Sequence, residues 1–591
     1  MRLMRRIFKF DFWFYFLGIL AIGAILFWWL RMGLSRYFDP DELAHLHWAW
    51  LQFRGEKPYV DFFYVLSPLF NFLFYPLFLV FGESISVLIF ARVISFLIYL
   101  LTALTIFLLG RELFGKRVGV LSVVVFVTLP IGLAKQIEIR PDNLSVAFFV
   151  LGLWAFFKGF CKAEFKSCKA EFKSCKAEFK SFKEESKWFF WSGLFLGAGT
   201  AVIQKGAVSA FAAVLLMVLL VVLLRRHDLV KIFRRVFWGM TIPVLVLLIY
   251  LLFKGVLIQG LEAIVVLALL TNLGIPFAPL HWFFLPIDIY YGGYRNFPYV
   301  FNRILFVFAG LAVLFFLLKV LKKRKWKKEE VGVLSLAFLA VFLTFLLEAL
   351  KATFLQYYLP VFPLVSILGA VGFLSLLEAL KISDRTKLIF YVCFLGACLF
   401  SSYKSYTGRE KWINEGNLKH IFAYLSVSGP EDRVFDFWGF YVFKKDGYFV
   451  CCNHFPDFPK KLKARLPDFV GWMKKNENKF ITYQEKDEGI IGNRIALLSQ
   501  KQINFLRENY VPIGVREIRV VGHEFDFGKS PVEKVEIFAA GDYRVIGGEI
   551  MIDGKRYKPG EVLFLGKGVH EFGGRGKVTV RYNWEEKKIT N

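Results

Sequence analysis

The sequence predicts a polytopic α-helical membrane protein of about eleven spans, followed by a soluble C-terminal region of mixed α/β structure and a small β-sandwich. Three observations predict it. Hydrophobic residues make up 56% of the 591 residues, and they recur in runs of about 20, the length that crosses a bilayer core as a helix. Lys and Arg gather in short segments between these runs. From residue 405 onward, short strand-like patterns replace the long apolar runs.

The first predicted span covers residues 12–31, and we expect it to stay in the protein, because the run is long enough to span and shows no small-residue cleavage site. The run 67–81 is short and contains Pro68, Asn71 and Pro76, so it is expected to be a re-entrant or interfacial helix. Further spans are predicted at 84–110, 118–134, 142–160, 188–204, 206–224, 236–253, 300–320, 331–349, 356–379 and 387–403.

Charge decides the expected topology. If 67–81 does not span, all the basic segments fall on the side of the N-terminus; they are 111–117, 158–187, 225–235, 322–328 and 381–387. By the positive-inside rule that side is cytoplasmic, and the C-terminal region is extracytoplasmic. We therefore expect a multi-pass protein of the cell (inner or plasma) membrane. The formal net charge of +27 reflects this topology and contact with anionic lipid, and does not indicate nucleic acid.

Three parts are predicted. Residues 1–404 form the transmembrane domain, residues 405–510 a mixed α/β region, and residues 511–591 a small β-sandwich-like domain with glycine turns between alternating strands. The transmembrane domain includes a first outer loop at 32–66, a Lys-rich cytoplasmic repeat at 158–187 and an outer aromatic loop at 254–298. The repeat carries CKAEFKS three times in tandem, which predicts a basic amphipathic helix on the inner membrane surface, with a partner-binding helix as the alternative.

Polar residues from five outer segments fall on one face of the predicted topology. Each has a structural explanation by itself, as a snorkelling Lys, a capping Asp or a solvated loop, but together they predict a shared outer cavity. They are Asp39, Asp41 and Glu42 in the first loop, Lys135, Glu138, Arg140 and Asp142 in the second, Lys205 in the third, Arg295 in the aromatic loop, and Lys351 with Tyr357 in the last.

Mixed acids and bases at a membrane surface suit a lipid that carries phosphate. Arg and Lys neutralise phosphate, Arg as a fork and Lys as a compact charge. Carboxylates activate a nucleophilic hydroxyl or hold a metal ion. Aromatic rings cover the face of a sugar.

Several stretches follow one another in the order of a known family. They are the acidic pair Asp41–Glu42, GEKPYVDF, SPLFNFLF, FGESISVLIFARVISFL, IEIRPDNL, GLFLGAGTAVIQKG and QYYLPVFPLVSILGA. The chain thereby resembles, over about residues 10–405, the GT-C membrane glycosyltransferases, especially the branch of lipid A aminoarabinose transferases and protein O-mannosyltransferases. No single stretch is diagnostic, but their order and spacing together are fairly specific.

The resemblance implies transfer of a sugar from a polyprenyl-phosphate donor, with inversion, on the outer face of the membrane, to a lipid, glycan or protein acceptor. Asp41 or Glu42 would be the catalytic carboxylate. The second acidic site would be Glu138 or Asp142, and the donor-phosphate candidates are Arg140, Lys205 and Lys351, with Arg295 and Tyr357 as further substrate-binding side chains. One departure is VLSPLF, which lacks the Lys that the aminoarabinose branch has before this segment; Lys57 is nearby but displaced.

No cofactor is required by this interpretation. Some family members use a divalent metal at the acidic pair, and Asp41 and His45 are four residues apart, so they would share a helix face. That spacing is also common in surface helices, so a metal at Asp41 and His45 remains a secondary hypothesis.

Two other classes of function compete with the enzyme. A transporter or flippase of lipid-linked sugars often has two related halves with broken helices at the midplane, and no such internal repetition is visible. A membrane-anchored carbohydrate-binding or assembly protein would use the C-terminal sandwich, which has aromatic residues but no recognisable catalytic set.

Overall fold

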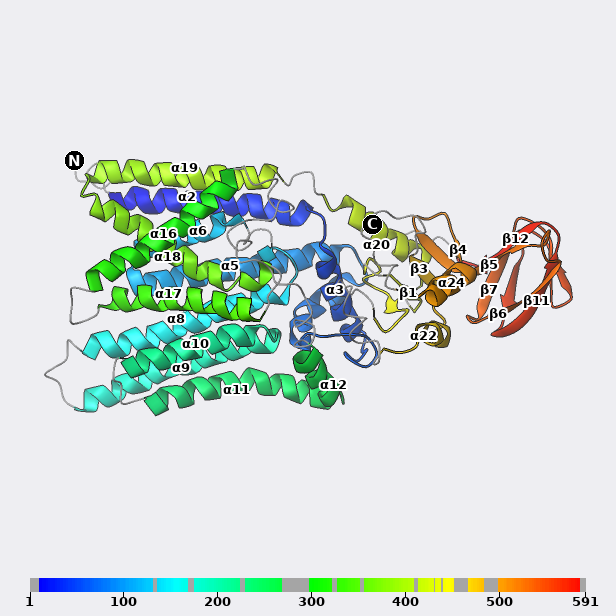
Figure 1. Cartoon of the computed structure of the whole chain (residues 1–591), viewed down its shortest axis with the longest axis horizontal. Helices are drawn as coiled ribbons and strands as arrows, with labels where there is room; N and C mark the ends of the chain where they lie inside the picture. The colour runs from blue at the N-terminus through cyan, green and yellow to red at the C-terminus, as the bar shows by residue number, and fades with distance from the viewer. Residues whose placement is uncertain are drawn as a thin grey trace.

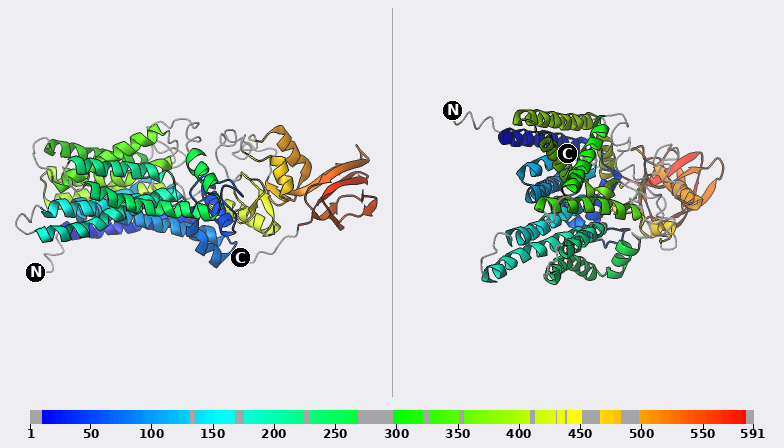
Figure 2. Two further views of the ribbon diagram at one scale, coloured as in Figure 1. Left: turned by 90° about the horizontal axis from the view of Figure 1, so that it is seen from below. Right: turned by 60° about the vertical axis from the view of Figure 1, so that its left-hand side comes forward.

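A bundle of long helices and a smaller region of helices and strands beside one of its ends make up the molecule (Figure 1). The views in Figure 2 show the same arrangement, with the red strands of the last part of the chain furthest from the bundle. The computed structural model describes residues 10–130, 135–167, 175–223, 229–267, 297–320, 327–350, 355–408, 413–429, 431–436, 439–450, 466–482 and 498–584.

Each of the predicted spans corresponds to a helix. By length and composition, nine helices of the described residues could cross a membrane. Two more lie at predicted spans: α6 is short at 13 residues, and α9 begins with a charged segment. The helices are α2 Phe10–Ser35, α5 Ser86–Phe114, α6 Lys116–Thr128, α8 Pro141–Ser167, α9 Cys175–Val202, α10 Gly206–Leu223, α11 Leu229–Phe253, α16 Phe297–Val320, α17 Lys328–Ala349, α18 Val361–Ala379 and α19 Asp384–Thr407. The prediction of a polytopic helical protein is confirmed.

The run 67–81 forms two short elements, the 3₁₀ helix η1 (Pro68–Phe74) and helix α4 (Tyr75–Phe81). Seven residues of 3₁₀ helix and seven of α-helix reach about 25 Å, short of a hydrocarbon core of about 30 Å. The α4 side chains Leu79 and Val80 remain 75% and 72% exposed, so the element offers an apolar face to its surroundings. The predicted aromatic loop begins with α12 (Leu257–Leu261) and the π-helix η2 (Glu262–Leu267); its residues 268–296 lie outside the described residues.

Two ion pairs lie at the end of the bundle that the predicted topology assigns to the cytoplasm. Arg117 Nε lies 2.6 Å from Asp11 Oδ1, which joins the start of α6 to the start of α2. Lys328 Nζ lies 3.4 Å from Glu112 Oε1, which joins the start of α17 to the last turn of α5. The first loop and the C-terminal region lie at the other end (Figure 1).

The C-terminal region is built on two sheets. The larger has eight strands in the order β10-β7-β12-β5-β3-β1-β2, with β4 also paired to β5, and the smaller has the order β6-β11-β8-β9. The elements are α20 Glu415–Val427, β1 Arg433–Phe435, β2 Lys445–Asp446, α22 Phe469–Lys475, β3 Phe480–Thr482, α24 Gln500–Asn509, β4 Tyr510–Pro512, β5 Ile518–Asp526, β6 Val532–Ile537, β7 Gly541–Ile546, β8 Ile550–Ile552, β9 Lys555–Tyr557, β10 Val562–Leu565, β11 Gly568–Gly574 and β12 Lys577–Tyr582.

Strand β5 connects the two predicted C-terminal parts. It pairs antiparallel with β3, Val520 opposite Phe480, and with β12, His523 opposite Val580. A Cβ at Gly522 would lie 2.7 Å from both Arg581 Cα and Val580 O, so this close approach of strands requires glycine. One sheet therefore runs through the predicted boundary at residue 510. Side chains of both sheets share one apolar core, as in a sandwich.

Backbone contacts fasten this region to the helical bundle. The amide of Asn414 donates to Ser35 O at 2.9 Å, and the amide of Phe63 donates to Phe449 O at 2.8 Å. The Asn417 side chain accepts from the amide of Phe38 at 2.9 Å. The C-terminal region is thus seated on the first outer loop.

Candidate active site

The first outer loop contains the 14-residue helix α3 (Pro40–Phe53), whose start follows from its sequence. Asp39 is the N-cap: its side chain accepts from the amide of Asp41 at 3.0 Å. The Glu42 carboxylate accepts from the amide of Asp39 at 2.9 Å, completing a capping box with Pro40 in the first turn. Local capping therefore places three carboxylates at one helix N-terminus, where the helix dipole favours negative charge.

Glu42 points into the protein and binds Arg92 of α5. Its side chain has no exposed surface, and Oε2 also accepts from the backbone amide of Ile139 at 3.2 Å. Arg92 donates further hydrogen bonds to the carbonyls of Gly33, Arg36 and Tyr37. Glu42 thus joins the first loop, α5 and the segment before α8. Because its carboxylate is buried, a substrate has no open path to its oxygens in this arrangement.

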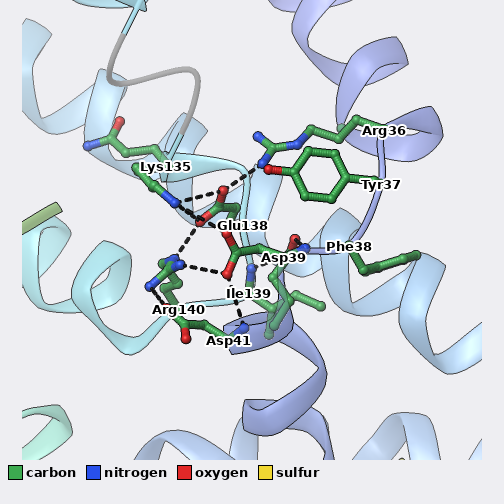
Figure 3. A network of polar contacts seen from close by, with 12 residues as sticks. Arg36, Tyr37, Phe38, Asp39, Asp41, Lys135, Glu138, Ile139 and Arg140 are labelled. Atoms are coloured by element: carbon green, nitrogen blue, oxygen red, sulfur yellow. Dashed lines mark hydrogen bonds and ion pairs between the residues drawn. The ribbon is translucent and has the colours of Figure 1, made fainter. Parts of the chain in front are cut away.

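Arg140 contacts three carboxylates beside the start of α3 (Figure 3). Its Nη1 lies 2.6 Å from Asp41 Oδ2, its Nη2 3.1 Å from Asp39 Oδ1, and its Nε 2.5 Å from Glu138 Oε2. One guanidinium therefore holds three carboxylates, a use that suits its planar fork of donors.

Glu138 lies at the centre of the same network. Arg36 Nη2 contacts its Oε1 at 2.6 Å and Lys135 Nζ contacts its Oε2 at 3.1 Å. The segment is fixed by Asn143 of α8, whose Nδ2 donates to the carbonyls of Lys135, Gln136 and Glu138 at 3.1, 3.1 and 2.8 Å. With Asp39, Asp41 and Arg140, three acids meet three bases, so the buried charges compensate one another.

These contacts set the ionisation of the acids. Burial raises the pKa of Asp39, but the attraction of Arg140 and Lys135 outweighs burial and holds the pKa of this carboxyl below its ordinary value. The pKa of Glu138 is lowered in the same way: burial raises it, but the attraction of Lys135 and Arg140 lowers it by more than burial raises it. The side chains of Asp41 and Asp39 keep 31% and 17% exposure, against 0% for Glu138. The network therefore presents its aspartates to the outside.

A second charged group adjoins this network. Lys205 Nζ lies 3.8 Å from Asp142 Oδ1 and 3.7 Å from the centre of the Tyr357 ring. Burial lowers the pKa of Lys205, but Asp142 and Tyr357 raise it more, so the pKa is above its ordinary value, and Arg140 is near enough to oppose them. The Lys205 side chain is 35% exposed. The Lys205 ammonium is therefore positioned by Asp142 and Tyr357 and is still accessible to a ligand.

The turn between α9 and α10 fixes the position of Lys205. A Cβ at Gly206 would lie 2.3 Å from Gly199 O, so the turn can close this tightly only at a glycine. The Ser145 hydroxyl of α8 donates to Gly199 O at 3.0 Å and ties the turn to the helix that carries Asp142.

The predicted site residues divide accordingly. Asp41, Glu42, Glu138 and Arg140 lie in or beside one network, and Asp142, Lys205 and Tyr357 form the second group; Arg295 and Lys351 lie outside the described residues. Sequence reasoning missed Arg36 and Arg92. Arg92 had a signal, because it is the only charged residue in the predicted span 84–110.

The hypothesis of a metal at Asp41 and His45 has little support from the donor set. No group of three or more His, Cys, Asp or Glu able to hold a metal occurs in the described part of the chain. The Asp41 carboxylate is already neutralised by Arg140, and the His45 ring lies edge-on to Trp48 and Phe70. We therefore derive no step through a metal.

Comparison with known proteins bears on the fold. The family model described as dolichyl-phosphate-mannose-protein mannosyltransferase matches residues 66–168. The chain is similar to the crystal structure of ArnT from Cupriavidus metallidurans in the apo state, with a TM-score of 0.54, 13% identity, and coverage of 85% of this chain and 97% of that one. The chain has the GT-C fold. No curated protein matches it.

Two further solved structures share the GT-C fold with this chain. ArnT from the same organism bound to undecaprenyl phosphate matches with a TM-score of 0.51, 13% identity, and coverage of 85% and 97% of the two chains. The Archaeoglobus fulgidus oligosaccharyltransferase in complex with Zn and sulfate matches with a TM-score of 0.52, 10% identity, and coverage of 97% and 98%. At such identities the likeness establishes the fold, and residue roles have to be argued from this chain.

Proposed function

We propose that this GT-C protein is a membrane glycosyltransferase that moves a sugar from a polyprenyl-phosphate donor to a lipid, glycan or protein acceptor. One observation carries the proposal. Asp41 contacts Arg140, and Arg140 is near enough to Lys205 to oppose the rise in the pKa of that lysine, so a partly exposed carboxylate and a partly exposed ammonium belong to one charged site. A general base and a phosphate ligand are the two groups that such a transfer needs. The family match and the likeness to ArnT bound to undecaprenyl phosphate support it.

Lys205 is the proposed ligand of the donor phosphate. Asp142 and the Tyr357 ring hold the ammonium, so little side-chain freedom is lost when it binds. Arg140 adds positive charge nearby. In the proposed complex the sugar attached to this phosphate lies toward Arg140, which contacts the two aspartates at the start of α3.

Asp41 is the proposed general base. In the reaction the acceptor oxygen attacks the anomeric carbon, and the bond from that carbon to the phosphate oxygen breaks. The polyprenyl phosphate leaves with the electron pair of this bond, and the acceptor proton passes to the Asp41 carboxylate. Attack opposite the leaving group inverts the anomeric carbon. Arg140 orients Asp41 by a direct contact of 2.6 Å.

We place this site on the outer side of the cell membrane. The basic loops 111–117, 225–235 and 381–387 are assigned to the cytoplasm by the positive-inside rule. The N-terminus and the Lys-rich repeat then share the cytoplasmic side, and the C-terminal region, which contacts the first outer loop, lies outside.

The test is turnover of the purified protein in lipid nanodiscs with polyprenyl-phosphate sugars, after mass spectrometry of the native lipid that copurifies. Asp41→Asn keeps the shape of the side chain and removes the base, so transfer should fall about 100-fold or more. The matched control is Asp61→Asn, a carboxylate of the same loop that caps the amide of Lys57; it should keep wild-type turnover.

Other results would change the assignment. Turnover retained by Asp41→Asn would move the base to Asp142, and turnover retained by both Asp41→Asn and Asp142→Asn would remove the carboxylate mechanism. Translocation of the lipid-linked sugar without transfer would favour the flippase.

A further inference from the structure

A buried contact joins α3 to the C-terminal region across 399 residues of sequence: His47 Nε2 lies 2.8 Å from Asp446 Oδ1. The His47 side chain has no exposed surface, and that of Asp446 is 4% exposed. His47 Nδ1 lies 2.9 Å from the carbonyl of Val442. A carbonyl only accepts, so Nδ1 carries a proton, and a second proton lies between Nε2 and the carboxylate.

Several contacts fix the C-terminal side of this pair. The Tyr441 hydroxyl donates to Asp446 Oδ1 at 2.6 Å, and its ring lies edge-on to His47. Arg433 Nη1 donates to the backbone carbonyl of Asp446 at 2.9 Å. Asp446 is also in β2, which pairs in parallel with β1, and β1 pairs with β3 of the same sheet. The carboxylate is therefore mounted on the large sheet.

The other side of the contact leads to the proposed base. His47 follows Asp41 in the same helix, about 9 Å along its axis. Residues Glu42–Gln52 of α3 are all buried, so the helix is packed along this whole length. A shift of His47 would be passed on to Asp41 and Asp39, and from them to Arg140.

We infer that His47 and Asp446 are positioning residues of the transferase: they hold α3 so that Asp41 stays against Arg140 and faces the donor. This inference rests on the proposed function. A displacement of about 1 Å at reacting groups can lower a rate about 100-fold. The C-terminal region is then a working part of the active site, although none of its described side chains belongs to the charged network.

A second link between the same segments provides a control. Arg54 Nη2 lies 2.7 Å from Glu431 Oε1, but the two side chains are 37% and 65% exposed. Exposed pairs hold their partners weakly, whereas loss of one member of a buried pair leaves a buried charge uncompensated. Only the buried pair is expected to fix α3.

The experiment compares three variants in nanodiscs. Asp446→Ala removes the contact. Asp446→Asn preserves the contact with His47, because one amide hydrogen is donated to Nε2 while Nδ1 still donates to Val442; the Tyr441 hydroxyl, which donates to Asp446 in the wild type, then has to accept the other amide hydrogen. Glu431→Ala is the control. We measure kcat and the donor KM per folded molecule, and the hydrogen exchange of the α3 amides. If Asp446→Ala does not fold, His47→Asn replaces it, since its amide keeps the bond to Val442 and loses only the one to Asp446.

The expected result for Asp446→Ala is a kcat about 100-fold lower, a donor KM within about twofold of wild type, and α3 exchange at least about 10-fold faster. Asp446→Asn should recover kcat to within about fivefold of wild type, and Glu431→Ala should match wild type. A folded Asp446→Ala or His47→Asn with wild-type kcat, or with a raised KM alone, would overturn the inference.

If the wild-type protein transfers sugar from no donor, the proposed function fails. The role of the His47–Asp446 contact is then tested by the hydrogen exchange of the α3 amides alone. Faster exchange confined to α3 supports its role in holding the helix, and unchanged exchange overturns that role as well.

Discussion

Arg92 holds Glu42 by two hydrogen bonds, Nε to Oε2 at 2.9 Å and Nη2 to Oε1 at 2.7 Å. The side chains are 1% and 0% exposed, and the guanidinium carbon lies 3.8 Å from the centre of the Phe38 ring. A charge on a membrane helix is thus used to anchor the loop that carries the proposed base, rather than to meet a substrate.

This relationship predicts a large effect on stability. Arg92→Ala leaves the Glu42 carboxylate buried without its partner, so the free energy of unfolding should fall by about 3–5 kcal/mol. Thermal unfolding in detergent measures it. Arg54→Ala, which breaks an exposed pair, should cost about 1 kcal/mol or less. An unfolding midpoint for Arg92→Ala equal to that of Arg54→Ala would contradict the assignment.

The second prediction concerns the donor phosphate. Lys205→Ala should raise the donor KM about 10- to 100-fold, because a charge-assisted hydrogen bond contributes about 1.5–3 kcal/mol, while kcat should change less. The control is Lys254→Ala, a lysine that follows α11 at the same end of the bundle. A lowered kcat with an unchanged KM would place Lys205 in the chemical step instead of in phosphate binding.

The third prediction follows from the lowered pKa values of Asp39 and Glu138. A carboxyl whose pKa is lower in the folded state contributes stability that is complete above its unfolded pKa, about 4, and is lost as the pH falls through the folded value. The unfolding midpoint should therefore decrease below about pH 4. Asp39→Asn removes one of the two groups, so the gap between wild type and variant should shrink on acidification; a widening gap would contradict the prediction.

Sequence reasoning succeeded where the physical rule is local. Apolar runs of about 20 residues have to be helices in lipid, and the eleven predicted spans all became helices. The proline-interrupted run from Pro68 forms two short elements and no long helix, as its composition suggests. The acidic first loop could also be recognised, because carboxylates beside a span are costly without partners.

The choice of partners could not be read in the same way. Glu42 and Asp41 are adjacent, yet the turn of α3 directs Glu42 to Arg92 and Asp41 to Arg140, so one is buried and the other accessible. The contact of His47 with Asp446 joins residues 399 apart. Strand β3 has three residues, too few for a sequence pattern, and it is this strand that carries the large sheet across residue 510.

The last prediction is the topology, on which the location of the reaction depends. In a variant that keeps only Cys168, a membrane-impermeant maleimide added from outside should not label the protein, since the Lys-rich repeat is assigned to the cytoplasm. In a cysteine-free variant with Lys567→Cys, the same reagent should label it, because Lys567 lies in the C-terminal region with half of its side chain exposed. Permeabilised cells provide the control, as both variants should then react. The reverse pattern would place the site of Asp41 and Lys205 in the cytoplasm, where the sugar would have to be transferred before the lipid carrier crosses the membrane.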